Sequence, residues 1–230
     1  LKSDPSLAEN IEKLKSKVPY VGEVLLGHVR YGTFGGNSVE NVHPFLRRNN
    51  WMHRNLILAG NFNMTNSKEL FESLVEIGQH PKEYTDTVII MEEIGHFLDN
   101  SVRKIRKDLK KIELSKDEIT KKISKKLDVF KILRKASKKW DGGYVIGGLL
   151  GHGDSFVVRD PNGIRPAFYY TDDEVVVVAS ERPAIQTAFN VDINKINELN
   201  SGDAIVIKNN GEVTIKNVTK AKENKSCSFE

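Results

Sequence analysis

The sequence predicts an α+β protein, and three observations lead to this fold class. Short apolar runs of strand length occur before residue 60 and again after residue 140. The residues between them repeat apolar side chains at helical spacing, and turn residues separate the second group of strands. Strands that come in groups, without regular alternation with helices, favour antiparallel sheets over a doubly wound chain. A length of 230 residues suits one domain.

The N-terminal part is expected to contain one helix and two strands. Apolar side chains recur at helical spacing over residues 6–18, and Pro19 ends this run. Residues 24–31 (VLLGHVRY) are a strand candidate, and a glycine-rich loop follows at 32–37. A second strand is expected over residues 55–59 (NLILA).

Two helices are expected to follow. Asn66 and Glu69 have the spacing of a capping box, and Gly78 would end the first helix. Its apolar side would consist of Leu70, Leu74 and Ile77. Another helix is expected after Asp86, with apolar positions at Ile89, Ile90, Ile94, Phe97 and Leu98.

A strongly basic segment comes next. Residues 101–140 contain 16 Lys and Arg against 5 Asp and Glu, a local net charge of +11, whereas the rest of the chain has a net charge of −7. We predict a basic helical arm over residues 101–139, a lysine-rich hairpin whose second helix begins at Ser115 with Glu118. Its apolar stripe would consist of Ile105, Leu109, Ile112, Ile119, Ile123, Leu127, Phe130 and Leu133.

After Trp140 the apolar spacing changes from helical to strand-like. Strands are predicted over residues 144–150, 156–159, 167–170 and 175–180, then a short helix over 183–189, and finally a hairpin of 204–207 with 213–218.

Composition excludes several classes of protein. No apolar run approaches the roughly 20 residues that a membrane-spanning helix needs. The single cysteine excludes an internal disulfide framework and a CxxC zinc site, and it fits a reducing cytoplasm, where we expect the protein. The sequence has no HExxH, phosphate-loop, dinucleotide-binding or GxSxG motif, and its six histidines are scattered.

Three polar positions could carry chemistry. Arg30 stands near the end of an apolar strand, where it could hold a carboxylate by two hydrogen bonds or form a structural ion pair. Asn61-Phe62-Asn63 follows the second strand and could stabilise an oxyanion or be an ordinary Asn-rich turn. Asp86 could bind an ammonium group or serve as an N-cap or first-turn carboxylate. Arg and Asp together match the charged ends of an α-amino acid.

These positions belong to segments that resemble the class II glutamine amidotransferases, which are of the N-terminal-nucleophile type. Residues 27–33 (GHVRYGT) resemble that family's GHxRYxT segment, 61–66 (NFNMTN) its NGNLxN oxyanion segment, and 85–86 its TSD segment. Similarity to the amidophosphoribosyltransferases in particular comes from residues 151–153 (GHG), 159–166 (RDPNGIRP), 179–181 (ASE) and 227–230 (CSFE), the last at the exit from their glutaminase domain.

The resemblance implies a four-layer αββα sandwich and a cysteine-dependent glutaminase. In the family, the thiolate of an N-terminal cysteine attacks the glutamine side-chain amide, the terminal α-amine transfers the proton, and a glutamyl thioester forms while ammonia leaves. By matching positions, Arg30 would bind the α-carboxylate of glutamine with Thr33 nearby, and Asp86 the α-ammonium. Asn61, through its side-chain amide, and Phe62, through its backbone N–H, would form the oxyanion hole.

Two features depart from the family pattern. The family's glycine after the oxyanion asparagine is Phe62 here, where a positive φ would be strained. The nucleophilic cysteine should precede Gly27 by more residues than the chain has, and the only cysteine, Cys227, matches the domain exit. We therefore expect residues 1–230 to be a glutaminase domain that is incomplete at its N-terminus and inactive alone.

The resemblance also implies a parent enzyme that transfers ammonia from glutamine to 5-phosphoribosyl-1-diphosphate in de novo purine synthesis. A phosphoribosyltransferase domain using Mg²⁺ would follow Glu230, the assembly would be a homo-oligomer, and this chain would hold no cofactor or metal. A glutamine–fructose-6-phosphate transaminase or an asparagine synthetase is an alternative within the class.

A different class of function would be a non-catalytic module that binds nucleic acid through the basic arm. The arm has one aromatic residue, Phe130, before Trp140, whereas single-strand binding uses interleaved aromatics. Lysines opposite an apolar stripe are typical of a solvated helix face, so we expect neither a nucleic-acid nor a membrane partner. A contact of the arm within an oligomer stays open.

Overall fold

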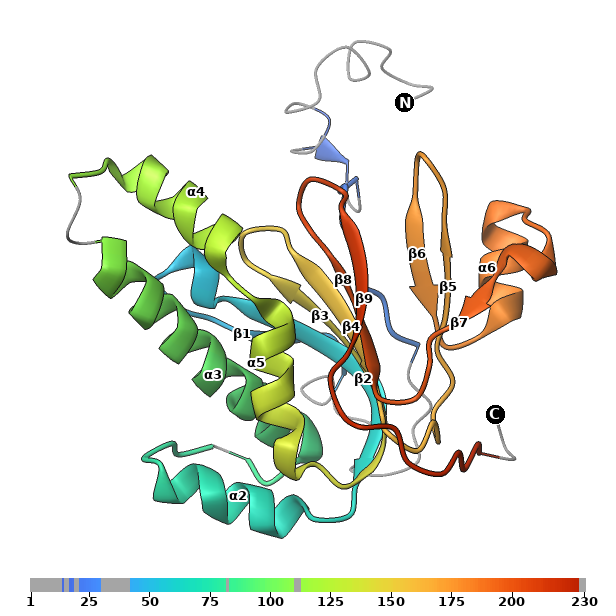
Figure 1. The fold of residues 1–230 in the computed structure, drawn as a ribbon, viewed down its shortest axis with the longest axis horizontal. Coiled ribbons are helices and arrows are strands. Elements are labelled where there is room, and N and C mark those ends of the chain that lie inside the picture. The colour runs from blue at the N-terminus through green and yellow to red at the C-terminus, as the bar shows by residue number, and fades with distance from the viewer. Residues whose placement is uncertain are drawn as a thin grey trace.

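The computed structural model describes residues 14, 17, 18, 21–29, 42–81, 83–109 and 113–227. It has two antiparallel sheets, and helices lie between their strands in the sequence (Figure 1). The α+β class predicted from the sequence is therefore confirmed.

The larger sheet has the strand order β1-β2-β3-β4-β8-β9, with each neighbouring pair antiparallel. Its strands are β1 (Phe45–Arg47), β2 (Leu56–Met64), β3 (Gly142–Leu150), β4 (Ser155–Arg159), β8 (Asp203–Ile207) and β9 (Val213–Asn217). The central pair is β2 with β3, whose register extends from Leu56 opposite Leu150 to Met64 opposite Gly142. Asn61 and Phe62 thus lie within a strand.

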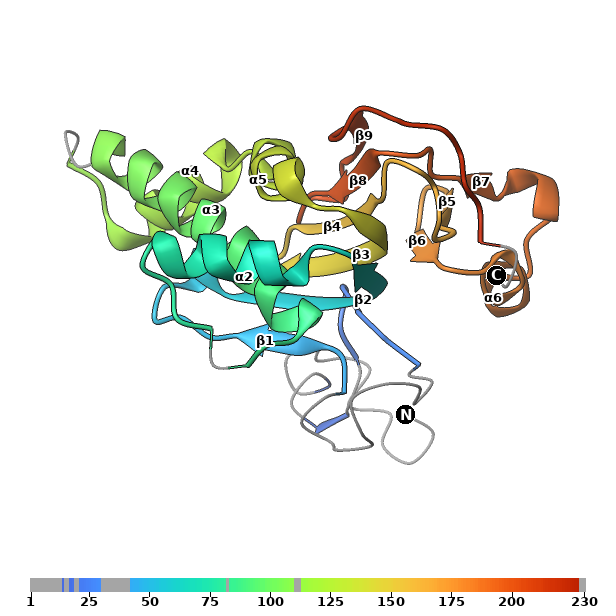
Figure 2. The ribbon, with the colours of Figure 1, turned by 90° about the horizontal axis from the view of Figure 1, so that it is seen from below.

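Four helices cover one face of this sheet (Figures 1 and 2). They are α2 (Ser67–Glu76), α3 (Asp86–Leu109), α4 (Lys116–Lys126) and α5 (Val129–Ala136). The main apolar core lies between, with Leu58 and Tyr144 from the sheet and Ile90 and Leu133 from the helices all buried. Among the described helices, none combines the length and apolar character needed to cross a bilayer.

A smaller sheet, in the order β6-β5-β7, packs on the other face of the larger one. Its strands are β5 (Phe168–Thr171), β6 (Val176–Ala179) and β7 (Asn197–Glu198), and α6 (Arg182–Phe189) lies against β5 and β6. A second apolar cluster around Ala167, Leu199 and Ile205 joins the two sheets. Three short 3₁₀ helices complete the described elements: η3 (Met52–Arg54), η4 (Ser137–Lys139) and η5 (Ile193–Lys195).

Two of the predicted helix-end signals are confirmed. The Ser115 side chain accepts a hydrogen bond from the Glu118 N–H, and the Glu118 carboxylate accepts one from the Ser115 N–H, so a capping box begins α4. After α2, Gly78 adopts a φ of 81°, and Gln79 N–H donates to Leu74 O at 2.9 Å. This geometry is a Schellman ending, which favours glycine at the left-handed position.

The division of the basic arm into helices was predicted wrongly. The helix expected after Asp86 and the first helix of the arm are one helix, α3. The expected second helix is two, α4 and α5, which run back along α3. The break falls at Asp128, whose carboxylate accepts a hydrogen bond from the Lys131 N–H at 3.0 Å and so caps a new helix.

The strand predicted over residues 24–31 is also wrong. The structure describes residues 24–29 of this segment, and their backbone is irregular. Leu25 and Val29 are exposed by 67% and 98%. Strand-forming residues favour a strand only where a neighbouring strand supplies hydrogen bonds and packing, and within the described residues none pairs with this segment. Residues 30–37, which include the predicted glycine-rich loop, lie outside the described residues. Most of the helix predicted over residues 6–18 also lies outside them. In its described part, the Val18 N–H donates a hydrogen bond to Leu14 O.

Asn66 does not cap α2 as predicted. Its amide instead donates to Lys139 O at 2.8 Å and accepts from the Asp141 N–H at 3.2 Å, so it ties the start of α2 to the end of the arm. Ile77, expected on the apolar side of α2, is 52% exposed because it falls at the turn that ends the helix.

Candidate functional site

One edge of β2 brings together several of the predicted site residues. Gly60 N–H donates to His43 Nδ1 at 3.3 Å, and Met64 N–H donates to Asp86 Oδ2 at 2.8 Å. Residues two apart on a strand direct their N–H groups to the same side, so the Phe62 N–H lies between these two on the same edge. The pairing with β1 ends at Leu58, so this N–H faces a part of the edge that β1 does not cover.

The bonds of the neighbouring strand agree with this direction. Tyr144 lies opposite Phe62, yet its N–H donates to Asp160 Oδ2 at 3.3 Å and its carbonyl accepts from the Asp160 N–H at 2.8 Å. Tyr144 therefore directs both backbone groups toward β4. Because paired residues either exchange both bonds or neither, the Phe62 N–H points away from β3.

Asn61 and Phe62 direct their side chains to opposite faces of β2. Phe62 packs against the main core, whereas Asn61 is exposed. Phe62 is not among the described residues with positive φ, of which Asn190 is the sole non-glycine. The strain that a phenylalanine would suffer at a left-handed glycine position is therefore avoided, and the turn considered for this segment is wrong, because β2 continues through it.

Asp86 anchors three elements beside this edge. It begins α3, and besides Met64 N–H its carboxylate accepts a hydrogen bond from the Ser67 hydroxyl of α2. The capping position belongs to Thr85, whose hydroxyl accepts from the Val88 N–H at 3.3 Å. Asp86 is thus a carboxylate in the first turn of α3, which is one of the two roles that the sequence suggested for it; the other was binding an ammonium group. Since a carboxylate offers about four acceptor positions, it can still receive an ammonium group.

His43 is a site residue that the sequence did not single out. Its Nδ1 accepts from Gly60 N–H, so the ring proton is on Nε2, which then donates to Thr87 Oγ1 at 3.1 Å. The imidazole stacks on the Phe62 ring with centroids 5.5 Å apart and lies 4.7 Å from the ring of His28. His43 therefore links the GHVRYGT segment, β2 and α3. The predicted residues Arg30 and Thr33 of that segment lie outside the described residues.

The second group of resembling segments serves the fold and not this site. The fully buried Asp160 carboxylate accepts hydrogen bonds from four backbone N–H groups, those of Tyr144, Asn162, Ile164 and Arg165. The Arg159 guanidinium donates to carbonyls of the same loop and to Glu198 at 2.7 Å. These bonds fix the loop between β4 and β5.

His152 lies at the far end of the sheet. The turn that carries it begins at Leu150, six residues and so roughly 20 Å along β3 from Tyr144. Its Nε2 is 3.1 Å from Asp154, and its ring is 5.4 Å from the ring of His53. His152 therefore takes no part in the β2 edge.

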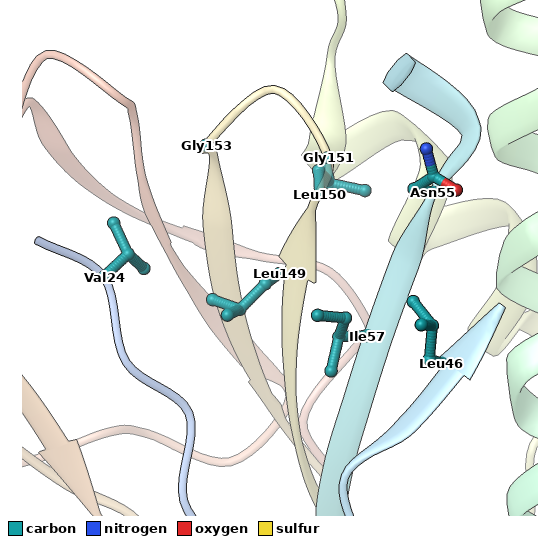
Figure 3. Close-up of a pocket in the computed structure, with 8 residues that line it drawn as sticks. All are labelled: Val24, Leu46, Asn55, Ile57, Leu149, Leu150, Gly151 and Gly153. Atoms are coloured by element: carbon teal, nitrogen blue, oxygen red, sulfur yellow. The ribbon is translucent and has the colours of Figure 1, made fainter. Parts of the chain in front are cut away.

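An apolar hollow of about 210 Å³ also lies away from this edge, at the other end of β2. Figure 3 shows Leu46, Ile57 and Leu149 pointing into it from three adjacent strands. The side-chain amide in its lining, Asn55, is already bonded to backbone groups of Asn49, Trp51 and Met52. The hollow therefore suits apolar packing better than the binding of a polar amino acid.

Among the described residues, no group of three or more His, Cys, Asp and Glu side chains is placed to hold a metal ion. Within the described part of the chain, the β2 edge offers hydrogen-bond donation from Phe62 and the negative charge of Asp86.

Comparisons with known proteins point to one family. The sequence model of the family described as "Glutamine amidotransferases class-II" matches residues 1–133. An amidophosphoribosyltransferase of Methanocaldococcus jannaschii is 30% identical over 203 residues, which cover 88% of this chain and 36% of that protein. One of Pseudomonas aeruginosa is 27% identical over 236 residues, covering 100% of this chain and 42% of that protein.

Two solved structures have a similar fold. One is a glutamine phosphoribosylpyrophosphate (PRPP) amidotransferase from B. subtilis complexed with ADP and GMP, with a TM-score of 0.61 and 22% identity. The other is described as the allosteric regulatory enzyme of purine biosynthesis, with a TM-score of 0.61 and 25% identity. Each match covers 88% of this chain and 36% of the other, so the chain spans well under half the length of these relatives.

Proposed function

Because this chain belongs to the class II glutamine amidotransferases, we propose that it binds L-glutamine at the β2 edge and contributes to its hydrolysis. The observation that carries the proposal is the position of the Phe62 N–H between the bonded N–H groups of Gly60 and Met64, next to the Asp86 carboxylate. Within the described residues no strand pairs with the edge of β2 at Phe62, and a donor there with a carboxylate close by matches a substrate that has a carbonyl at one end and an ammonium at the other.

In this proposal each residue has one role. Asp86 binds the α-ammonium, Arg30 binds the α-carboxylate, and Thr33 lies close to that carboxylate. The side-chain amide of Asn61 and the N–H of Phe62 stabilise the negative oxygen that develops when the glutamine side-chain amide is attacked. The loss of one such donor typically costs about 2.7–4 kcal/mol of transition-state stabilisation.

The attacking thiolate does not come from Cys227 in our proposal. Cys227 N–H donates to Ile164 O at 3.1 Å in the C-terminal segment, and the family resemblance places this cysteine at a domain exit. Since the sequence contains no other cysteine, we expect no turnover from these 230 residues alone. Glutamate release that is abolished by Cys227→Ala would contradict this part of the proposal.

The wider role follows from the names of the relatives. We propose that ammonia released here is transferred to 5-phosphoribosyl-1-diphosphate by a phosphoribosyltransferase domain that uses Mg²⁺, in a cytoplasmic homo-oligomer of purine synthesis. The relatives named amidophosphoribosyltransferase support this choice over a glutamine–fructose-6-phosphate transaminase or an asparagine synthetase. Residues encoded after Glu230 distinguish the three possibilities.

We extend the proposal to the architecture. The succession of α2–α5, the larger sheet, the smaller sheet and α6 supports a four-layer αββα sandwich of the N-terminal-nucleophile type. The C-terminal part of α3 with α4 and α5 would be a lysine-rich helical hairpin inserted into it. We assign no nucleic-acid role to this hairpin.

Equilibrium binding of L-glutamine, measured by calorimetry, tests the proposal. Arg30→Gln should weaken binding about tenfold or more, because a charged hydrogen-bonded pair contributes about 1.5–3 kcal/mol. Arg48→Gln is the matched control, since Arg48 is exposed. Equal affinities of the Arg30→Gln and Arg48→Gln variants would contradict the assignment.

A further inference from the structure

A second pocket, which we call the helix pocket, lies between α2, α3, α5 and η4 and has a volume of about 180 Å³. It is separate from the β2 edge, because Glu93 in its lining is seven residues from Asp86 along α3, roughly 10 Å. Its apolar part is formed by Leu74, Phe97 and Ala136, of which Leu74 and Ala136 are fully buried. This volume equals that of about six liquid water molecules, so a single aromatic ring with one small substituent fits it.

The rim of the helix pocket is cationic. Lys135, Lys138 and Lys139 all line it, and within the described part of the chain none of the three pairs with a carboxylate within 4.0 Å. Lys139 Nζ donates to Ser73 Oγ at 3.1 Å, and Lys135 Nζ lies 5.9 Å from the centroid of the Phe97 ring. Three ammonium groups around one hollow attract an anion.

The inner wall adds the carboxyl group of Glu93, which is mostly uncharged below neutral pH. Glu93 is 8% exposed, and its burial raises the pKa of its carboxyl group to about 7, although Lys139 and Trp140 partly oppose this. Trp140 does not line the pocket; its buried indole N–H lies near Glu93 and has no hydrogen-bond partner of normal geometry among the described residues. A protonated Glu93 is itself a donor, so this wall favours an acceptor.

No other charged group faces Glu93 from the helices that form the helix pocket. On its own helix, His96 accepts a hydrogen bond from the Asn100 amide at 2.8 Å, and burial lowers its pKa, so it is neutral at pH 7. α2 contributes Ser73, Leu74 and Ile77, which are uncharged, and the three lysines come from α5 and η4.

We propose that the helix pocket binds a small organic carboxylate with an apolar body, the body against Phe97 and Leu74 and the carboxylate among Lys135, Lys138 and Lys139. The proposal does not depend on glutamine chemistry at the β2 edge. It follows from the combination of an apolar floor with three lysines, none of them paired with a carboxylate among the described residues, around one hollow of limited size.

Benzoate is a suitable probe, titrated into the ¹⁵N-labelled chain with detection by NMR. We expect saturable shifts confined to residues of α2, the middle of α3, the end of α5 and η4. Affinity should fall about tenfold between pH 6 and pH 8, because with a pKa of about 7 the protonated fraction of Glu93 falls from about 0.9 to about 0.1. Glu93→Gln, which keeps a donor at every pH, should abolish this difference.

The double variant Lys135→Gln/Lys138→Gln should weaken benzoate binding about tenfold or more. The control is the double variant Lys121→Gln/Lys125→Gln on α4, which also removes two positive charges, from exposed positions, and should leave the affinity unaltered. Absence of saturation at about 50 mM benzoate and pH 6 would overturn the proposal. Equal effects of the two double variants would also overturn it, since binding would then depend on net charge and not on this pocket.

Discussion

Glu93 is a buried carboxyl group on α3, and its replacement by glutamine should stabilise the protein above neutral pH. The folded protein keeps this group protonated up to a pKa of about 7, whereas the unfolded chain loses the proton near 4.5. Between these values the folded state holds more protons than the unfolded state, so stability falls as pH rises from about 4.5 through 7. Glutamine has nearly the same shape and no charge to bury.

The magnitude follows from the two pKa values. A difference from 4.5 to about 7 corresponds to about 3 kcal/mol of unfavourable burial once Glu93 is ionised, and to under about 1 kcal/mol at pH 5. The gain from Glu93→Gln should therefore be about 2.5 kcal/mol larger at pH 8 than at pH 5.

Urea unfolding followed by tryptophan fluorescence at pH 5 and pH 8 measures this gain. Glu76→Gln, at the exposed end of α2, is the control and should change the free energy of unfolding by less than about 0.5 kcal/mol at both pH values. A Glu93→Gln effect that is the same at both pH values would refute the reasoning, because it would show that Glu93 is ionised in the folded state throughout this range.

Three further predictions concern stability. Ser115→Ala should cost about 1 kcal/mol of unfolding free energy through loss of the capping box with Glu118, and no change in urea unfolding would contradict that role. Asp160→Asn should cost about 3 kcal/mol or more, since an amide NH₂ would face N–H donors that now bond to the carboxylate; a loss under about 1 kcal/mol would be incompatible with those bonds. Burial lowers the pKa of His53, so the folded protein binds fewer protons than the unfolded chain below about pH 6.5 and loses stability as pH falls. The drop in Tm from pH 7.5 to 5.5 should be smaller in His53→Gln than in the exposed His80→Gln control, and equal drops would show that His53 does not contribute.

The strands after Trp140 were predictable because their pattern is local. Alternating apolar residues between turn residues identified β3, β4, β8 and β9 to within two residues at either end. The three-residue β1 and the two-residue β7 are too short to show alternation, and their register comes from the longer strands beside them.

The residues of the proposed site come from the family resemblance, whereas their arrangement comes only from the structure. Asn61, Phe62 and Asp86 could be identified by resemblance, yet only the register of β2 shows that Phe62 and Asp86 share one edge. His43 was missed because its partners, Gly60 and Thr87, are 17 and 44 residues away in the sequence, and a single histidine has no spacing signal of its own.

Binding of L-glutamine at the β2 edge is the central claim, and backbone amide shifts test it most directly. We predict that L-glutamine shifts the Phe62 and Met64 amides saturably, and that Asp86→Asn weakens this binding about tenfold or more. Asp108→Asn, the same change at an exposed position of α3, should leave the affinity unaltered. Unshifted Phe62 and Met64 amides at saturating L-glutamine, or equal affinities of the two variants, would contradict the account.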